Sequence, residues 1–143
     1  MTAYVAGLVG GIFALLSGIF ISMIVFYIPF EPASEYIVQM PSNFMLIISA
    51  VMSLANLIIG YLIVVNSGRI RRGQIYGGAT NLALGIIIFF VLNITFDTLQ
   101  EFFFIELLWS LLVRTPIFTT IATLISGALG IIAHAGTLTR EVM

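Results

Sequence analysis

Long apolar runs, separated by short polar segments, are the main pattern along this chain. Asp, Glu, Lys and Arg are absent from residues 1–30, 36–68, 73–96 and 115–139. Each run exceeds the roughly 20 residues that a helix needs to cross about 30 Å of hydrocarbon at 1.5 Å per residue. The pattern therefore predicts four membrane-length helices in an all-α chain.

Proline and glycine set the expected ends of these helices. Pro29 removes a backbone donor after the first run, and Gly68 is available as a C-terminal cap after the second. Thr115 and Pro116 fit the N-cap and the first helical position of the fourth run. We therefore expect helices over residues 4–27, 42–65, 74–96 and 115–136.

Residues 97–114 differ from the four runs because they mix charges with aromatic and aliphatic side chains. Asp97 is a candidate N-cap, and Trp109 is of the residue type that collects at the polar boundary of a membrane. We expect a short interfacial helix between the third and fourth helices, or an extension of the third. The expected fold is one domain, residues 1–143, a four-helix bundle of two hairpins, 1–68 and 69–143.

The two expected hairpins also resemble each other in sequence. Gly10-Gly11, followed after six residues by Gly18-Ile19, recurs 67 positions later as Gly77-Gly78 and Gly85-Ile86. A pattern that starts at Ser53 in the second helix recurs 73 positions later from Ser126 in the fourth. Because each unit holds an even number of helices, these matches predict two tandem hairpins in the same orientation, a parallel repeat.

Small and polar residues recur every three or four positions in the expected helices. Such stripes let helix backbones approach closely, since packing and interhelical hydrogen bonds replace the hydrophobic effect in apolar surroundings. The residues expected at helix contacts are Gly7, Gly11, Gly18, Ser53, Asn56, Gly60, Gly78, Asn81, Gly85, Ser126 and Gly130. Bulky side chains should then point toward lipid or neighbouring subunits, among them Phe13, Phe20, Leu57, Ile63, Ile88, Phe89 and Leu124.

Two amides, Asn56 and Asn81, are expected inside the bundle. Counted from the middle of the turn near residue 70, Asn56 lies about 14 residues before it and Asn81 about 11 after it. At 1.5 Å per residue their depths differ by only about 5 Å, so we expect the two side chains to meet directly or through a water. The alternative is that they line the polar path of a small channel.

Charge is distributed unequally between the two ends of the expected bundle. Arg69, Arg71 and Arg72 lie between the second and third helices and Arg140 near the C-terminus, whereas five of the six acidic residues lie in the other two connections. The positive-inside rule then places both termini and the three arginines on the cytoplasmic side of a cell membrane. The arginines either only set this orientation or face anionic phosphates, of lipid headgroups or of nucleic acid.

Few side chains in this sequence suit catalysis or metal binding. The chain has no Cys and no Lys, and its one histidine, His134, has no acidic residue in its apolar run. Zinc usually takes three or four protein ligands, so we expect a structural histidine, and we expect Glu101, Glu106 and Arg114 to form a hydrated interface. No nucleophile and base pair is recognisable, and the runs lack the buried charges of ion pathways. No enzyme activity, cofactor or metal is therefore expected.

The segments GGIFALLSGIFI and YGGATNLALGIIIFF, with basic residues gathered on one side, resemble the very hydrophobic all-helical coat proteins of spindle-shaped archaeal viruses. The resemblance implies a subunit that polymerises with copies of itself through apolar helix faces, in a shell around DNA, with the arginines turned inward. The expected function is that of a structural virion protein. The alternative is a small accessory subunit or orphan protein of an archaeal membrane, associated with larger membrane subunits.

Overall fold

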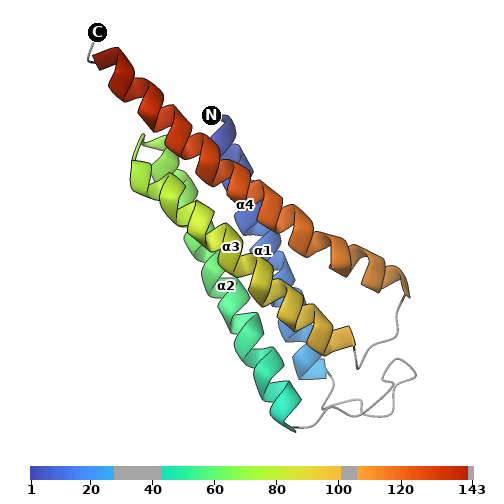
Figure 1. The fold of residues 1–143 in the computed structure, drawn as a ribbon. Coiled ribbons are helices and arrows are strands. Elements are labelled where there is room, and N and C mark those ends of the chain that lie inside the picture. The colour runs from blue at the N-terminus through green and yellow to red at the C-terminus, as the bar shows by residue number, and fades with distance from the viewer. Residues whose placement is uncertain (28–42, 101–105, 142–143) are drawn as a thin grey trace.

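A computed structural model describes residues 1–27, 43–100 and 106–141 of the chain. These residues form four helices: α1 (Thr2–Tyr27), α2 (Asn43–Arg71), α3 (Ile75–Gln100) and α4 (Glu106–Glu141). The helices pack as a bundle in which each contacts its neighbours in the chain, and α4 also contacts α1 (Figure 1). The all-α four-helix bundle predicted from the apolar runs is therefore confirmed.

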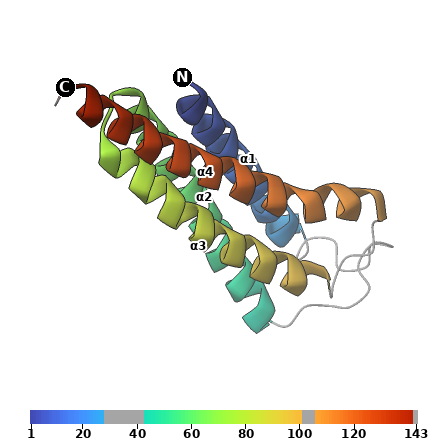
Figure 2. The ribbon, with the colours of Figure 1, turned by 45° about the horizontal axis from the view of Figure 1, so that its top comes forward.

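Both termini and the α2–α3 turn lie at the same end of the bundle (Figure 1). Contacts support this arrangement, because Arg71 lies over the ring of Tyr4 and His134 bonds to Gly73. The view in Figure 2 keeps the same grouping, and there the first turns of α4 diverge from α1. The shared end predicted from the charge distribution is thus confirmed.

The predicted C-terminal cap at Gly68 is wrong, because α2 continues through this residue to Arg71. The chain turns instead at Gly73, whose φ of +75° suits a residue without a Cβ. Glycine inside a helix costs only about 1 kcal/mol relative to alanine. Unpaired backbone groups in apolar surroundings cost several kcal/mol each, so continuing the helix past Gly68 is favoured.

The predicted start of the fourth helix is also wrong. Helix α4 begins at Glu106, and Pro116 lies inside it. Proline inside a membrane helix is tolerated because neighbouring groups satisfy the backbone carbonyl that it frees. Residues 97–100 extend α3 and residues 106–114 form the first turns of α4, in place of a separate interfacial helix. Glu31, Glu35 and Glu101 lie outside the described residues, as does Pro29.

Small polar residues share the interior of this bundle with apolar ones, and large apolar residues cover its outside. Among the described residues, twelve Ser, Thr and Asn side chains are buried against nine apolar ones, while 28 large apolar side chains are exposed. Each helix carries a window long and apolar enough to cross a membrane, and only 33–39% of each window is buried. A water-soluble chain has the opposite distribution.

Several of the buried hydroxyls are satisfied inside their own helix. Each donates a hydrogen bond to the backbone carbonyl four residues earlier, at 2.6–2.8 Å. The donors are Ser17, Ser67, Thr95 and Thr123. Their burial therefore leaves no unpaired group, and the small side chains let the helices come close.

The prediction that bulky side chains point outward holds for some positions and fails for others. Phe13 and Phe89 are exposed, and Phe20 is partly exposed. Ile63 and Ile88 are fully buried, so the prediction was wrong for these two. Four helices around one axis leave more space than glycine and serine can fill, and interiors pack without large voids.

Glycine contacts within the two hairpins match residue for residue. A Cβ added to Gly11 of α1 would lie 3.0 Å from the carbonyl oxygen of Gly60 in α2. A Cβ added to Gly78 of α3 would lie 3.0 Å from the carbonyl oxygen of Gly127 in α4. Both residues of the second pair lie 67 positions after their counterparts. The hairpins are therefore packed alike, while their origin by duplication stays a prediction.

Leu57 of α2 and Leu124 of α4 are also 67 positions apart, and they make equivalent contacts. Leu57 packs on Gly18 of α1, and Leu124 packs on Gly85 of α3. Both leucines are partly buried instead of pointing fully outward as predicted. At 67 positions the counterpart of Ser53 is Thr120, so the 73-residue match to Ser126 gave the wrong register. In helices rich in Ala and Ile, sequence similarity over a short segment does not distinguish an offset of 67 residues from one of 73.

Candidate functional site

The last residues of α2 and its connection to α3, together residues 69–74, form an ordered turn that we call the arginine turn. The amides of Arg72 and Gln74 both donate to the carbonyl of Arg69 at 3.1 Å, and the amide of Gly73 donates to that of Ile70 at 2.9 Å. These bonds satisfy the carbonyls of Arg69 and Ile70 in the last turn of α2. The turn therefore holds its three arginines at defined backbone positions.

Two of the three guanidinium groups are also held by neighbouring side chains. Arg69 donates from Nη1 to Oδ1 of the buried Asn66 at 3.0 Å. The guanidinium carbon of Arg71 lies 5.5 Å from the ring centroid of Tyr4 in α1, within the range of a cation–π contact. Arg69, Arg71 and Arg72 are all exposed, so their remaining donors are accessible.

His134 joins α4 to this turn. Its Nδ1 lies 2.9 Å from the carbonyl oxygen of Gly73. Since a carbonyl only accepts hydrogen bonds, Nδ1 is the donor. Within the described ranges, no group of three or more His, Cys, Asp or Glu side chains gathers to hold a metal. The contact gives His134 a part in fixing the shape of the turn.

A polar layer, made of Gly7, Ser67, Asn81 and Ser126, brings together one residue from each helix. Nδ2 of Asn81 donates to the hydroxyls of Ser67 at 3.2 Å and Ser126 at 3.1 Å. Ser126 in turn donates to the carbonyl of Ala3 at 2.7 Å. A Cβ on Gly7 would lie 2.9 Å from Asn81 Nδ2 and would overlap both serine hydroxyls. The layer therefore ties all four helices together close to the arginine turn.

The predicted meeting of Asn56 with Asn81 is wrong. Both are fully buried, but neither amide atom of Asn56 has a hydrogen-bond partner. Because α2 runs to Arg71 and α3 starts at Ile75, the middle of the turn is residue 73, so Asn56 lies 17 residues before it and Asn81 only 8 after it. At 1.5 Å per residue their depths then differ by about 14 Å, which is too far for contact.

Buried apolar residues lie between the depths of the two asparagines. On α2, Ile63 lies between Asn56 and the Ser67 that bonds to Asn81. Ile63 belongs to one apolar cluster with Ala14, Ile59, Leu84, Ile88 and Leu92. A path lined by both amides would have to cross this cluster, so the geometry offers no support for a channel.

The eleven residues predicted at helix contacts are all buried in the bundle. A second polar contact lies further from the arginine turn, where Ser53 of α2 donates to the carbonyl of Gly18 at 2.8 Å. Ser22 of α1 donates to the same carbonyl at 2.9 Å, and the two hydroxyls are 2.5 Å apart. These bonds tie α1 to α2 directly.

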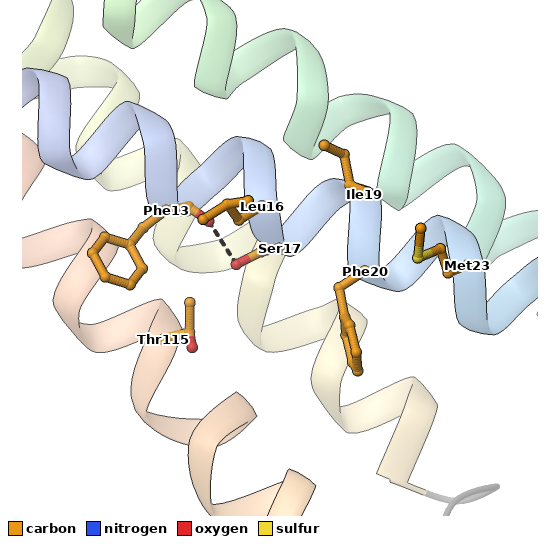
Figure 3. Close-up of a pocket in the computed structure, with 7 residues that line it drawn as sticks. All are labelled: Phe13, Leu16, Ser17, Ile19, Phe20, Met23 and Thr115. Atoms are coloured by element: carbon orange, nitrogen blue, oxygen red, sulfur yellow. Dashed lines mark hydrogen bonds between the residues drawn. The ribbon is translucent and has the colours of Figure 1, made fainter.

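A shallow groove of about 370 Å³ opens between α1 and the diverging part of α4 (Figure 3). Its lining is almost entirely apolar: Phe13, Leu16, Ser17, Ile19, Phe20, Met23 and Thr115. The hydroxyl of Ser17 is already used, because it donates to the carbonyl of Phe13 at 2.8 Å. The groove therefore presents apolar surface and no reactive group.

Sequence reasoning missed the residues that support the arginines. Asn66 lies three positions before Arg69, which places both on one helix face, but only once α2 is known to continue past Val65. Tyr4 carries no local signal, because it meets Arg71 from another helix. Comparison of the chain with protein families, curated proteins and solved structures found no match.

Proposed function

We propose that this chain is a non-enzymatic structural protein, embedded in an apolar surrounding by its four helices and associated through its outer faces with copies of itself. The observation that carries the proposal is the distribution of side chains among the described residues, with twelve Ser, Thr and Asn side chains beside nine apolar ones inside and 28 large apolar side chains outside. Lipid tails or the apolar helices of neighbouring subunits satisfy such a surface, whereas water does not.

A cell membrane is the first setting for this protein. The four apolar windows of 21–26 residues match the thickness of a bilayer. The three arginines share one end with both termini, so the positive-inside rule places this end in the cytoplasm. In this setting the protein works as a membrane scaffold or as an accessory subunit beside larger membrane proteins.

Fractionation and cross-linking test this proposal. The protein should stay with membranes after an alkaline wash, and after extraction in mild detergent it should cross-link to other copies of the same chain. A protein that leaves the membrane in the wash is not embedded in it. If the protein stays in the membrane but only monomers are found after cross-linking, it does not associate with itself.

A coat subunit of a spindle-shaped virus is the second candidate. The arginine turn favours it, because three exposed guanidiniums at one end of every subunit would give a shell a basic inner wall for DNA phosphates. Such a protein should be recovered mainly from particles that contain DNA and little lipid. Recovery only from cell membranes, or an arginine turn on the outer wall of a particle, would exclude this candidate.

A further inference from the structure

We infer that the arginine turn is a binding site for the phosphate of an anionic phospholipid, formed by Arg69, Arg71 and Arg72 with Asn66 and Tyr4 as supports. The inference rests on the proposed membrane setting and assigns the turn a ligand. Three features of the structure carry it: the depth of the turn, the charge at this end, and the way in which the guanidiniums are held.

The turn lies at the depth of lipid headgroups. Arg71 ends the apolar window that starts at Leu46, and the next window begins at Ile75. Arg69 and Arg71 therefore lie in the last turn of one span, and residues 72–74 connect it to the next. Tyr76, directly after the turn, is 77% exposed. Tyrosine collects at the level of the headgroups, where its ring and its hydroxyl meet different surroundings.

The positive charge at this end exceeds what the helix itself needs. Asp and Glu are absent from residues 1–25, 44–95 and 115–136, which include every described side chain near the turn. The C-terminus of α2 carries a partial charge of only about −0.5 from the helix dipole. Among these described residues, the three guanidiniums therefore leave an excess of more than two positive charges, which an anionic phosphate would complement.

Two of the guanidiniums are held by neighbouring side chains, and the positive-inside rule does not need such contacts to orient the protein in the membrane. An orientation signal depends on the number of positive charges in a loop and not on where they point. The guanidinium carbon of Arg71, however, lies 5.5 Å from the centre of the Tyr4 ring, and this cation–π contact uses none of the N–H donors that fit a phosphate. Arg69 uses one nitrogen on Asn66 and keeps its others. The turn is therefore prepared for an anion.

Lipid phosphate fits this position better than nucleic-acid phosphate. The three arginines lie where the apolar helix α2 ends, and the apolar helix α3 that follows exposes Ile75 and Tyr76 directly after them. In a bilayer those faces are already surrounded by lipid, so a headgroup meets the turn without leaving its leaflet. DNA would have to approach the same headgroup layer against the negative charge of the membrane.

The test is a lipid competition with the full chain. Detergent-solubilised protein is equilibrated with equal amounts of phosphatidylcholine and phosphatidylglycerol, free lipid is removed, and the lipid that stays bound is quantified. We expect at least about tenfold enrichment of phosphatidylglycerol, because each basic residue near a membrane surface favours anionic lipid about fivefold. The triple variant R69Q/R71Q/R72Q should show no enrichment.

Matched variants separate a built site from charge alone. Arg72→Gln should lower the enrichment about fivefold, whereas Arg140→Gln, which removes one positive charge outside the turn, should lower it less than twofold. Tyr4→Leu should lower it two- to fivefold and Tyr4→Phe should not, because phenylalanine keeps the ring face. Circular dichroism on every variant should report unchanged helix content.

Three outcomes would overturn the inference. Equal enrichment in the wild type and the triple glutamine variant would remove the turn from lipid binding. Full enrichment in a triple lysine variant would show that the positive charge of the turn is sufficient and that the guanidinium geometry is not needed. Displacement of the lipid by low concentrations of duplex DNA would assign the turn to nucleic acid. A protein that stays membrane-embedded and self-associated in any of these cases keeps the proposed function, so the two failures are distinguishable.

Discussion

Replacing Gly7 by alanine should break the contact that holds all four helices together near the arginine turn. The added methyl group would overlap the hydroxyls of Ser67 and Ser126 and lie 2.9 Å from Asn81 Nδ2. None of these atoms is the far end of a long flexible side chain. Helix α1 must therefore move away from the layer, or the hydrogen bonds of the layer must break.

The expected magnitude follows from three contributions. Alanine in place of glycine favours the helix by about 1 kcal/mol. Forcing a methyl group into a packed interior costs about 1–3 kcal/mol. Losing the two bonds donated by Asn81 costs about 0.6 kcal/mol each, the typical value for interhelical bonds in membranes. The net expectation for Gly7→Ala is a loss of about 2 kcal/mol in the free energy of unfolding.

Gly68→Ala is the matched control. Gly68 lies inside α2, and a Cβ there meets nothing within 4 Å. Only the gain in helix propensity applies, so this variant should be up to about 1 kcal/mol more stable than the wild type. The two alanine variants should therefore differ by about 3 kcal/mol, a factor of more than 100 in the unfolding equilibrium.

Reversible unfolding in mixed micelles, followed by helix content, measures these differences. A Gly7→Ala variant as stable as Gly68→Ala would refute the packing of the polar layer. A double-variant cycle sharpens the test, because Ser126→Ala removes one of the overlapped hydroxyls. The double variant should therefore be more stable than the sum of the two single changes predicts.

Three further predictions concern single positions. Asn81→Leu should destabilise the bundle by about 1 kcal/mol, since it removes two interhelical hydrogen bonds. Asn56→Leu should be neutral or stabilising, because the buried amide of Asn56 has no hydrogen-bond partner. Unfolding in micelles that showed Asn56→Leu to be the less stable variant would contradict this prediction. Gly73→Ala should cost about 1 kcal/mol or more from the left-handed backbone alone, with Gly73→Asn milder, and an equal stability of all three would contradict the φ of +75°. Because the chain has no cysteine, Thr2→Cys and Arg72→Cys can each be labelled with a membrane-impermeant maleimide, and both should react from the same side of sealed vesicles.

The local pattern was sufficient to predict the class of fold, and it failed where continuation of a helix depends on the surroundings. Glycine and proline end helices in water, so Gly68 and Pro116 were expected as boundaries. In apolar surroundings an unpaired backbone group is more costly than either residue inside a helix, and both helices continue. The extra turn at the end of α2 then changed the depth of Asn56 relative to Asn81.

The candidate site was predictable in its charges and not in its geometry. The clustering of Arg69, Arg71 and Arg72 is visible in the sequence. That Arg71 lies over the ring of Tyr4 depends on how α1 packs against α2, which brings together residues 67 positions apart in the chain. No periodicity within one helix encodes such a contact, because it depends on the register between two helices.

By itself the sequence determined the number of helices, their apolar character and the end at which both termini and the arginines gather, because each of these follows from local hydrophobicity, helix rise and an even number of spans. Only the tertiary structure decided the registers. The two hairpins share one internal register, yet Gly10 packs on Thr119 and Thr123 of α4 while its counterpart Gly77 packs on Asn66 and Ile70 of α2. Glycine permits close approach of two helices at many registers, and the short turn between α2 and α3, together with the four-helix polar layer, selects one of them.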